Sequence, residues 1–183
     1  MRRASILIIL AVFFAGYIFS AARMEQLRAN GTDVLLALAP VDPRALLMGD
    51  YMELEYTVNN AIRSAVRPTR GGGDSEGRAV LRLDRVRDSH GGAAEPSESP
   101  RGEAVFARLD DGSPLADGEV FIQFKLRGGE IRSAASAFYF QEGRAALYEG
   151  ARFGRVKVDG NGKTLLVTLC DAKGMDIAPE EKP

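Results

Sequence analysis

The sequence predicts a mainly β protein, in which an N-terminal single transmembrane helix is followed by one antiparallel β-rich barrel or sandwich domain with one or two short helices. Three observations lead to this prediction. Residues 4–22 are apolar and carry no charge. About seven later stretches have the alternating or apolar pattern of strands. Turn residues separate these stretches closely, which favours antiparallel pairing.

The first element is the uncharged segment at residues 4–22. About 20 apolar residues are enough to span a bilayer. Arg2 and Arg3 precede the segment and are expected to stay in the cytoplasm, which puts the remainder on the periplasmic or extracytoplasmic side. The alternative is a signal peptide cleaved after Ser20-Ala21-Ala22. The length of the apolar run favours an uncleaved anchor in the cell inner membrane, and the domain is exported in either case.

We expect an anchor and juxtamembrane helix at residues 1–31, an exported domain at 32–178, and a polar tail at 179–183. A stretch rich in Gly, Pro and Ser at 67–103 is expected to be a flexible insert, because it cannot bury enough apolar surface to offset its ordering entropy. Residues 79–87 are the exception, since Val80, Leu81 and Leu83 suit a strand or a short docked helix. The arginines around them are interpreted as a solvated face.

The remaining elements follow in order along the chain. Strands are expected at residues 32–39, 50–58, 104–110, 119–126, 130–140, 152–158 and 163–170. Short helices are candidates at residues 43–48, 59–66 and 144–149. The first strand is apolar throughout, so it should be central or covered on both faces. Turns at 127–129 and 159–162 contain the Gly-Gly, Asp-Gly and Asn-Gly pairs typical of hairpins.

The most regular pattern lies at residues 40–58. Asp42 and Pro43 predict a helix start, because Asp accepts hydrogen bonds from free backbone N–H groups and Pro suits the first helical position. Gly49 is expected to end that helix. Beyond it, alternate residues are apolar and should face the core, namely Met52, Leu54, Tyr56 and Val58. Glu53 and Glu55 should face water or a partner, and Tyr51 is the better candidate for a binding surface.

This stretch also carries a family motif. Gly49, Asp50, Tyr51, Leu54 and Tyr56 fill the five fixed positions of the signature GDYXXLXY. The chain therefore resembles the GDYXXLXY family of bacterial membrane-anchored proteins. Residues 40–44 and a second block at 139–143 are similar to that family as well. The resemblance implies an architecture and an envelope location, but no chemistry.

The candidate binding or motif residues gather in these two blocks. They are Asp42, Arg44, Gly49, Asp50, Tyr51, Leu54, Tyr56, Glu142 and Gly143. Asp50, with Arg44 within reach, suits the cation of a ligand or partner, although a structural pair with Arg44 or a cap of the local turn is the favoured interpretation. Glu142 would complete this site if the two blocks meet in space. Its plainer role is to complement the dipole of a following helix.

The composition argues against several functional classes. A formal net charge of −1 gives no electrostatic footprint for nucleic acid. A single His and a single Cys do not support a His/Cys zinc site or a His-based triad, and Cys170 lies in an apolar run typical of a buried, inert thiol. The turn before Gly49-Asp50 resembles that of type I signal peptidases, but no serine precedes it at residues 38–43. We therefore expect no enzyme activity, no metal and no cofactor.

The function expected from the sequence is a non-enzymatic interaction module or accessory subunit of an integral membrane protein in the cell envelope. The bilayer itself is the other expected partner, through the N-terminal helix. The alternative is an extracytoplasmic sensor of a small ligand or cell-wall fragment, using Arg44, Asp50, Tyr51 and Glu142. A hydrolase that uses carboxylates is the third possibility.

Overall fold

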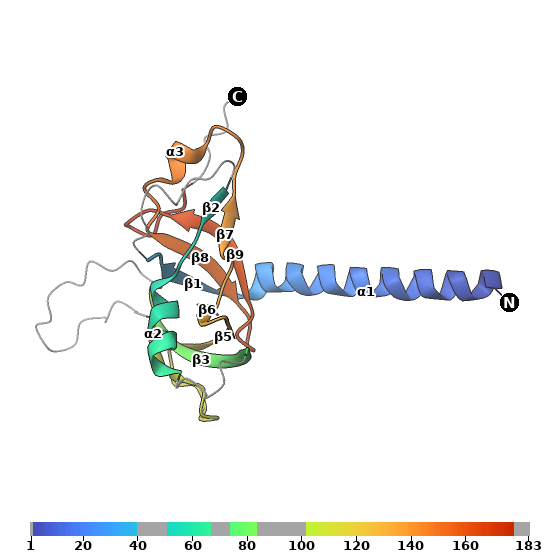
Figure 1. Ribbon diagram of the computed structural model, residues 1–183, viewed down its shortest axis with the longest axis horizontal. Coiled ribbons are helices and arrows are strands. Elements are labelled where there is room, and N and C mark those ends of the chain that lie inside the picture. Colours follow the sequence, from blue (N-terminus) through green and yellow to red (C-terminus); the bar gives the residue numbers. More distant parts are fainter. Residues whose placement is uncertain (1, 40–50, 67–73, 84–101, 178–183) are drawn as a thin grey trace, which may run out of the picture.

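The structure, a computed structural model, describes residues 2–39, 51–66, 74–83 and 102–177, with side chains from residue 9 onward. It consists of one long helix and a β domain (Figure 1). Helix α1 (Arg2–Asn30) projects away from the domain, and Gly31 alone separates it from strand β1 (Thr32–Ala37). No helix in the described part of the chain is both long and apolar enough to cross a membrane.

The strands of the described residues form three antiparallel sheets. One sheet has the order β1-β8-β9, with β8 at Phe153–Val158 and β9 at Thr164–Cys170. A second is a two-stranded ribbon of β2 (Tyr51–Glu53) and β7 (Ala137–Tyr139). The third has the order β4-β3-β5-β6, with strands at Ala104–Leu109, Ser75–Leu83, Glu119–Arg127 and Glu130–Arg132. The prediction of a mainly β, antiparallel domain is confirmed.

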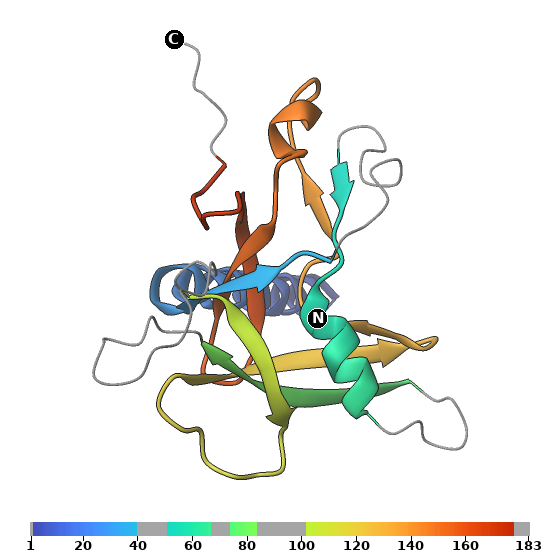
Figure 2. The same ribbon diagram turned by 90° about the vertical axis from the view of Figure 1, so that its left-hand side faces the viewer.

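Two short helices in the described part of the chain accompany the sheets. Helix α2 (Thr57–Ala65) lies across the four-stranded sheet, against β4 and β6 (Figure 2). Helix α3 (Ala145–Tyr148) is a single turn beside the ribbon (Figure 1). Helix α3 falls within the candidate helix at residues 144–149, whereas α2 overlaps the candidate at residues 59–66 but begins earlier, at Thr57. The predicted helix at residues 43–48 lies outside the described residues.

Strand β1 is covered on both faces, as its apolar sequence predicts. Val34 and Leu36 belong to the main core, whereas Leu35 packs with Phe153 and Cys170 in a second cluster. The strand is at the edge of its sheet rather than at its centre. The Leu35 N–H nevertheless donates a hydrogen bond to the Gly102 carbonyl at 2.9 Å, so the outer edge of β1 is partly covered.

The predicted strand at residues 50–58 is correct in its burial but wrong in its length. All four apolar residues, Met52, Leu54, Tyr56 and Val58, are buried. The strand ends at Glu53, and α2 begins at Thr57. The Leu54 N–H still donates to Ser136 O in the register of the ribbon. The backbone then leaves the ribbon, since Glu55 O accepts the Ala39 N–H and Tyr56 O accepts the Asn59 N–H in the first turn of α2. The four apolar side chains that strand alternation predicts to be buried are therefore buried, although Val58 lies in a helix.

The expected insert at residues 67–103 is not flexible throughout. Strand β3 lies within it and pairs with both β4 and β5. Ala79, Val80 and Leu81 are completely buried there. Gly77, one of the residues that suggested flexibility, is required by packing, because a Cβ atom at this position would lie 2.7 Å from the Phe124 ring. The strand thus begins at Ser75, before residue 79, where the apolar run predicted from the sequence starts.

The predicted strand at residues 130–140 is split into β6 and β7, which belong to different sheets. The residues between them hydrogen-bond to other parts of the chain. Ser133 O accepts from Thr164 Oγ1, and Ala135 O accepts from the Tyr56 hydroxyl, both at 3.0 Å. Ser136 O accepts from Leu54 N at 2.8 Å. These bonds replace the continued pairing with β5 that a single return strand would have made.

The turn between β8 and β9 is the hairpin that the sequence predicts. One oxygen of Asp159 accepts hydrogen bonds from the N–H groups of Asn161 and Lys163, both at 2.9 Å. Gly162 has a φ of +88°. Its carbonyl accepts from Gln123 N at 2.7 Å, which fixes the hairpin tip against β5.

The single cysteine is buried, as its apolar surroundings predict. Cys170 is completely inaccessible to solvent. Burial raises the pKa of its thiol to about 11, and a hydrogen bond from Sγ to the Asp176 carboxylate at 3.2 Å acts in the same direction. The thiol is therefore protonated at neutral pH, which suits a structural rather than a nucleophilic role.

The raised pKa of Cys170 predicts a pH dependence of stability. Between its ordinary value of 9.0 and about 11, the unfolded chain releases the thiol proton while the folded chain keeps it. This contribution to the free energy of unfolding is complete below pH 9 and is lost as the pH rises toward 11. Urea unfolding between pH 8 and 10.5 should show a smaller loss of stability for Cys170→Ala than for the wild type. Equal losses in both proteins would contradict the assignment.

Gly162 predicts a second stability effect. Replacement with Ala imposes a side chain at positive φ and brings Cβ within 3.0 Å of the Ile122 and Gln123 backbone. We expect Gly162→Ala to lower the free energy of unfolding by about 1–3 kcal/mol. Gly160→Ala in the same turn is the matched control, because a Cβ atom there meets nothing within 4 Å. Urea denaturation of both variants measures the difference, and equal midpoints would show that the hairpin tip does not depend on close contact with β5.

Candidate functional site

The two motif blocks meet in space. Strand β2 begins at Tyr51, the third residue of the GDYXXLXY motif, and β7 ends at the first residue of the second block. They pair antiparallel with Tyr51 opposite Tyr139 and Met52 opposite Phe138. The condition for a joint site, that the two blocks meet, is therefore met by the residues of each block that the structure describes.

The ribbon has one packed face and one open face. On the packed face, the Phe138 ring lies edge-on to Tyr148 of α3, with centroids 5.1 Å apart, and Phe140 stacks on the same tyrosine at 5.2 Å. On the open face, Tyr51 and Tyr139 contact each other with centroids 5.6 Å apart. Tyr139 is 75% exposed and Tyr51 is 37% exposed. Such an exposed aromatic pair, supported from behind, is typical of protein interaction surfaces.

The later motif residues are structural. Leu54 and Tyr56 are buried in the main core. Burial raises the pKa of the Tyr56 phenol well above its usual range, so the hydroxyl is a permanent donor to the Ala135 carbonyl at 3.0 Å. The ring also packs over the backbone of Gly154 in β8. These contacts hold the ribbon to the body of the domain.

The second block turns the chain from β7 into α3. Glu142 and Gly143 are both exposed in this turn, and Gly143 has a φ of +78°. The Arg144 N–H closes the turn on the Gln141 carbonyl at 3.1 Å. Asp42, Arg44, Gly49 and Asp50 lie outside the described residues, so a cluster of Arg44, Asp50 and Glu142 stays a prediction.

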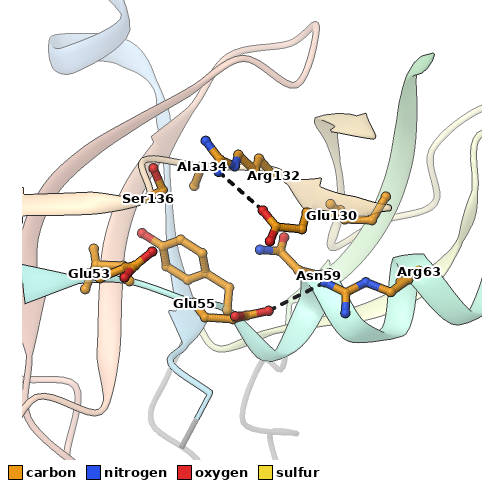
Figure 3. A pocket seen from close by; sticks show the side chains of 11 residues that line it. Glu53, Glu55, Asn59, Arg63, Glu130, Arg132, Ala134 and Ser136 are labelled. Atoms are coloured by element: carbon orange, nitrogen blue, oxygen red, sulfur yellow. Dashed lines mark hydrogen bonds and ion pairs between the residues drawn. The ribbon is translucent and has the colours of Figure 1, made fainter. Parts of the chain in front are cut away.

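The structure also contains a small polar pocket that the sequence does not reveal (Figure 3). Its volume is about 200 Å³. It lies between residues 53–56, α2, β6 and residues 134–136. Its lining residues are Glu53, Leu54, Glu55, Tyr56, Asn59, Arg63, Glu130, Ile131, Arg132, Ala134 and Ser136.

Charges of both signs line this pocket. Arg63 lies 3.7 Å from Glu55, and Arg132 lies 3.3 Å from Glu130. Within the described residues, no three His, Cys, Asp or Glu side chains gather closely enough to hold a metal ion. The arrangement is thus suited to binding charged groups. The sequence predicts Glu53 and Glu55 on an open face. The pocket does not follow from the sequence, because its other wall, with Glu130 and Arg132, comes from β6, which is distant in the chain.

Comparisons with known proteins place these features in a family. Neither the curated proteins nor the solved structures contain a match to the chain. The family model described as GDYXXLXY protein matches residues 13–169, which include both motif blocks. Because the match covers far more than half of the sequence, the chain belongs to the GDYXXLXY family.

Proposed function

We propose that this protein is a membrane-anchored extracytoplasmic interaction module, most simply a non-enzymatic accessory subunit of an integral membrane protein in the cell envelope. The observation that carries the proposal is the Tyr51–Tyr139 pair, exposed on a ribbon that the family motif builds. The helix supplies the second part of the argument, because it would hold this surface beside other proteins of the same membrane.

The surface of α1 supports the anchor. Its large apolar side chains from Ile9 to Phe19 point into solvent and are between 49% and 69% exposed. They are Ile9, Leu10, Val12, Phe13, Phe14, Tyr17, Ile18 and Phe19. A helix with apolar residues around its circumference is stable when lipid or protein surrounds it. The proposal rests on the whole uncharged segment at residues 4–22, the first part of which precedes the described side chains.

The ribbon supports the interaction role. Aromatic side chains supply large contact areas at a low cost in conformational entropy, and they are enriched at the centres of interfaces. Tyr139 exposes most of its surface, although its ring is already positioned by Tyr51. A partner that covers both rings would bury apolar area without first having to order them.

The alternative function is a sensor of a small ligand, and the polar pocket is the observation that favours it. Its walls come from the motif strand, α2 and β6, so a ligand held there would stiffen the connection between the ribbon and the four-stranded sheet. A hydrolase has less support, because Glu55 and Glu130 each lie beside an arginine in an arrangement that suits charge recognition.

The anchor proposal predicts the behaviour of the full-length chain in its own membrane. The protein should remain in the membrane pellet after an alkaline carbonate wash. Mass spectrometry should show that the chain retains residues 1–22. A variant with Val12→Arg and Phe13→Arg should be released or fail to insert, because a charge near the bilayer centre costs about 3 kcal/mol. Recovery of a soluble chain that begins after residue 22 would instead establish a cleaved signal peptide.

The interaction proposal predicts a specific loss. Full-length protein purified in detergent from its own membrane should carry an integral membrane protein, and Tyr139→Ala should reduce the amount recovered at least about tenfold, as for a hot-spot residue. Met175→Ala is the matched control, because Met175 is an exposed apolar residue distant from the ribbon in sequence. Equal recovery with the two variants would contradict an interface at the ribbon.

A further inference from the structure

The polar pocket has a fixed donor at its centre. Asn59 is only 5% exposed, and its Oδ1 accepts a hydrogen bond from Ser133 Oγ at 2.6 Å. That bond assigns the oxygen of the amide to Ser133 and leaves the NH₂ group directed into the pocket, between the carboxylates of Glu55 and Glu130 (Figure 3). Ser133 is itself 5% exposed, so the orientation of Asn59 is set by a buried pair. Within the described residues, the one hydrogen bond of the Asn59 side chain is the bond that its Oδ1 accepts from Ser133, so the NH₂ group is available to a ligand.

The charged side chains in the pocket lining form only weak ion pairs with one another. The 3.7 Å separation of Arg63 and Glu55 is longer than a hydrogen bond, and both side chains are nearly half exposed. Arg132 and Glu130 are two residues apart on one strand and are more than 60% exposed. Exposed ion pairs of this kind contribute little to stability, typically about 0–1 kcal/mol. Their members can therefore turn toward a ligand at a low cost.

The inner end of the pocket is apolar. Leu54, Tyr56 and Ile131 line it and are each no more than 5% exposed. A ligand that reaches this end would place a small apolar group against buried side chains while its charged groups stay near the rim. The volume of about 200 Å³ limits such a ligand to roughly ten non-hydrogen atoms.

From these observations we propose that the pocket binds a small zwitterion of the amino-acid type. The ligand carboxylate is recognised by Arg63 together with the Asn59 amide, which are four residues apart on one face of α2. The ligand ammonium lies among the carboxylates of Glu53, Glu55 and Glu130. Three carboxylates and two arginines give the lining a formal charge of −1, so a purely anionic ligand is disfavoured.

The family motif sharpens this inference. Leu54 and Tyr56, which occupy fixed positions of GDYXXLXY, form the apolar end of the pocket. Glu53 and Glu55 occupy positions that the motif leaves open. The motif thus specifies the frame of the pocket, whereas the charges on its wall belong to this chain. We therefore assign zwitterion binding to this protein and not to the family as a whole.

Saturation-transfer NMR of the full-length protein in detergent tests the proposal. The probes are glycine, L-alanine and the dipeptide alanyl-alanine, compared with methylammonium and acetate, which each carry only one of the two charges. We expect at least one zwitterion to bind with a measurable Kd at millimolar concentration or below, and both single-charge compounds to bind at least about tenfold more weakly. Absence of binding by all three zwitterions, or equal binding by the single-charge compounds, would overturn the proposal.

Matched variants locate the binding. Arg63→Gln and Glu53→Gln should each weaken zwitterion binding about tenfold or more, because each removes a charged hydrogen-bond partner. Arg82→Gln and Glu149→Gln remove the same charges at exposed positions outside the pocket and should leave the Kd unchanged. Equal effects of pocket and control variants would show that the binding lies elsewhere. This test is independent of partner recovery, so it can fail while the interaction role of the ribbon holds.

Discussion

Residues 133–136 are the point on which the rest of the domain depends, because hydrogen bonds from three parts of the chain converge there. Ser133 binds Asn59 of α2 through its hydroxyl and Thr164 of β9 through its carbonyl. Ala135 and Ser136 accept from Tyr56 and Leu54 of the motif. Residues 133–136, which we call the crossing, thus join the four-stranded sheet, the three-stranded sheet and the ribbon. The hydrogen bonds of this one backbone segment connect elements that strand pairing would connect in a single continuous sheet.

The crossing also explains why the motif has its spacing. Leu54 and Tyr56 are two residues apart, so in extended backbone they lie on the same side and reach the core together. Between them, the backbone turns from the ribbon toward α2. The Tyr56 hydroxyl holds this turn in place by donating a hydrogen bond to the Ala135 carbonyl. The buried hydroxyl would be costly without this acceptor. Tyr rather than Phe at this position is therefore a consequence of the carbonyl that faces it.

The sequence predicts the elements that have a strong local pattern and fails where the pattern depends on distant partners. The β5 strand, the turn at Gly128 and the Asp159 hairpin all follow from alternation and turn chemistry. Only the N-terminal part of β3, before residue 79, is hidden, because Gly77 looks like a flexible residue until the Phe124 ring is placed against it. The break after Arg132 is hidden for the same reason, since nothing local shows that the next carbonyls are taken by Tyr56 and Leu54.

The candidate site likewise has a part that the sequence predicts and a part that it does not. Tyr51 as a surface residue and Tyr56 as a core residue follow from strand alternation alone. The meeting of the two motif blocks was a conditional hypothesis, because no local pattern determines which strand pairs with which. The pocket was not foreseeable, since β6, which supplies Glu130 and Arg132, approaches the motif only through long-range packing. Long-range pairing, rather than residue chemistry, is what the sequence leaves open.

The junction between helix and domain adds a constraint on any partner. Leu27 of α1 is 6% exposed, and a Cβ atom on Gly31 would lie 2.5 Å from the Leu27 carbonyl and 3.0 Å from Lys157 of β8. The helix therefore packs directly against the domain instead of ending in a free linker. Residues 23–30 extend only about 12 Å along the helix axis. If residues 4–22 are held in a bilayer, the domain lies close to the membrane surface in a defined orientation. A protein that covers Tyr51 and Tyr139 must then present its own binding surface at a matching height, which an integral membrane protein with a short exposed region satisfies better than a freely diffusing one.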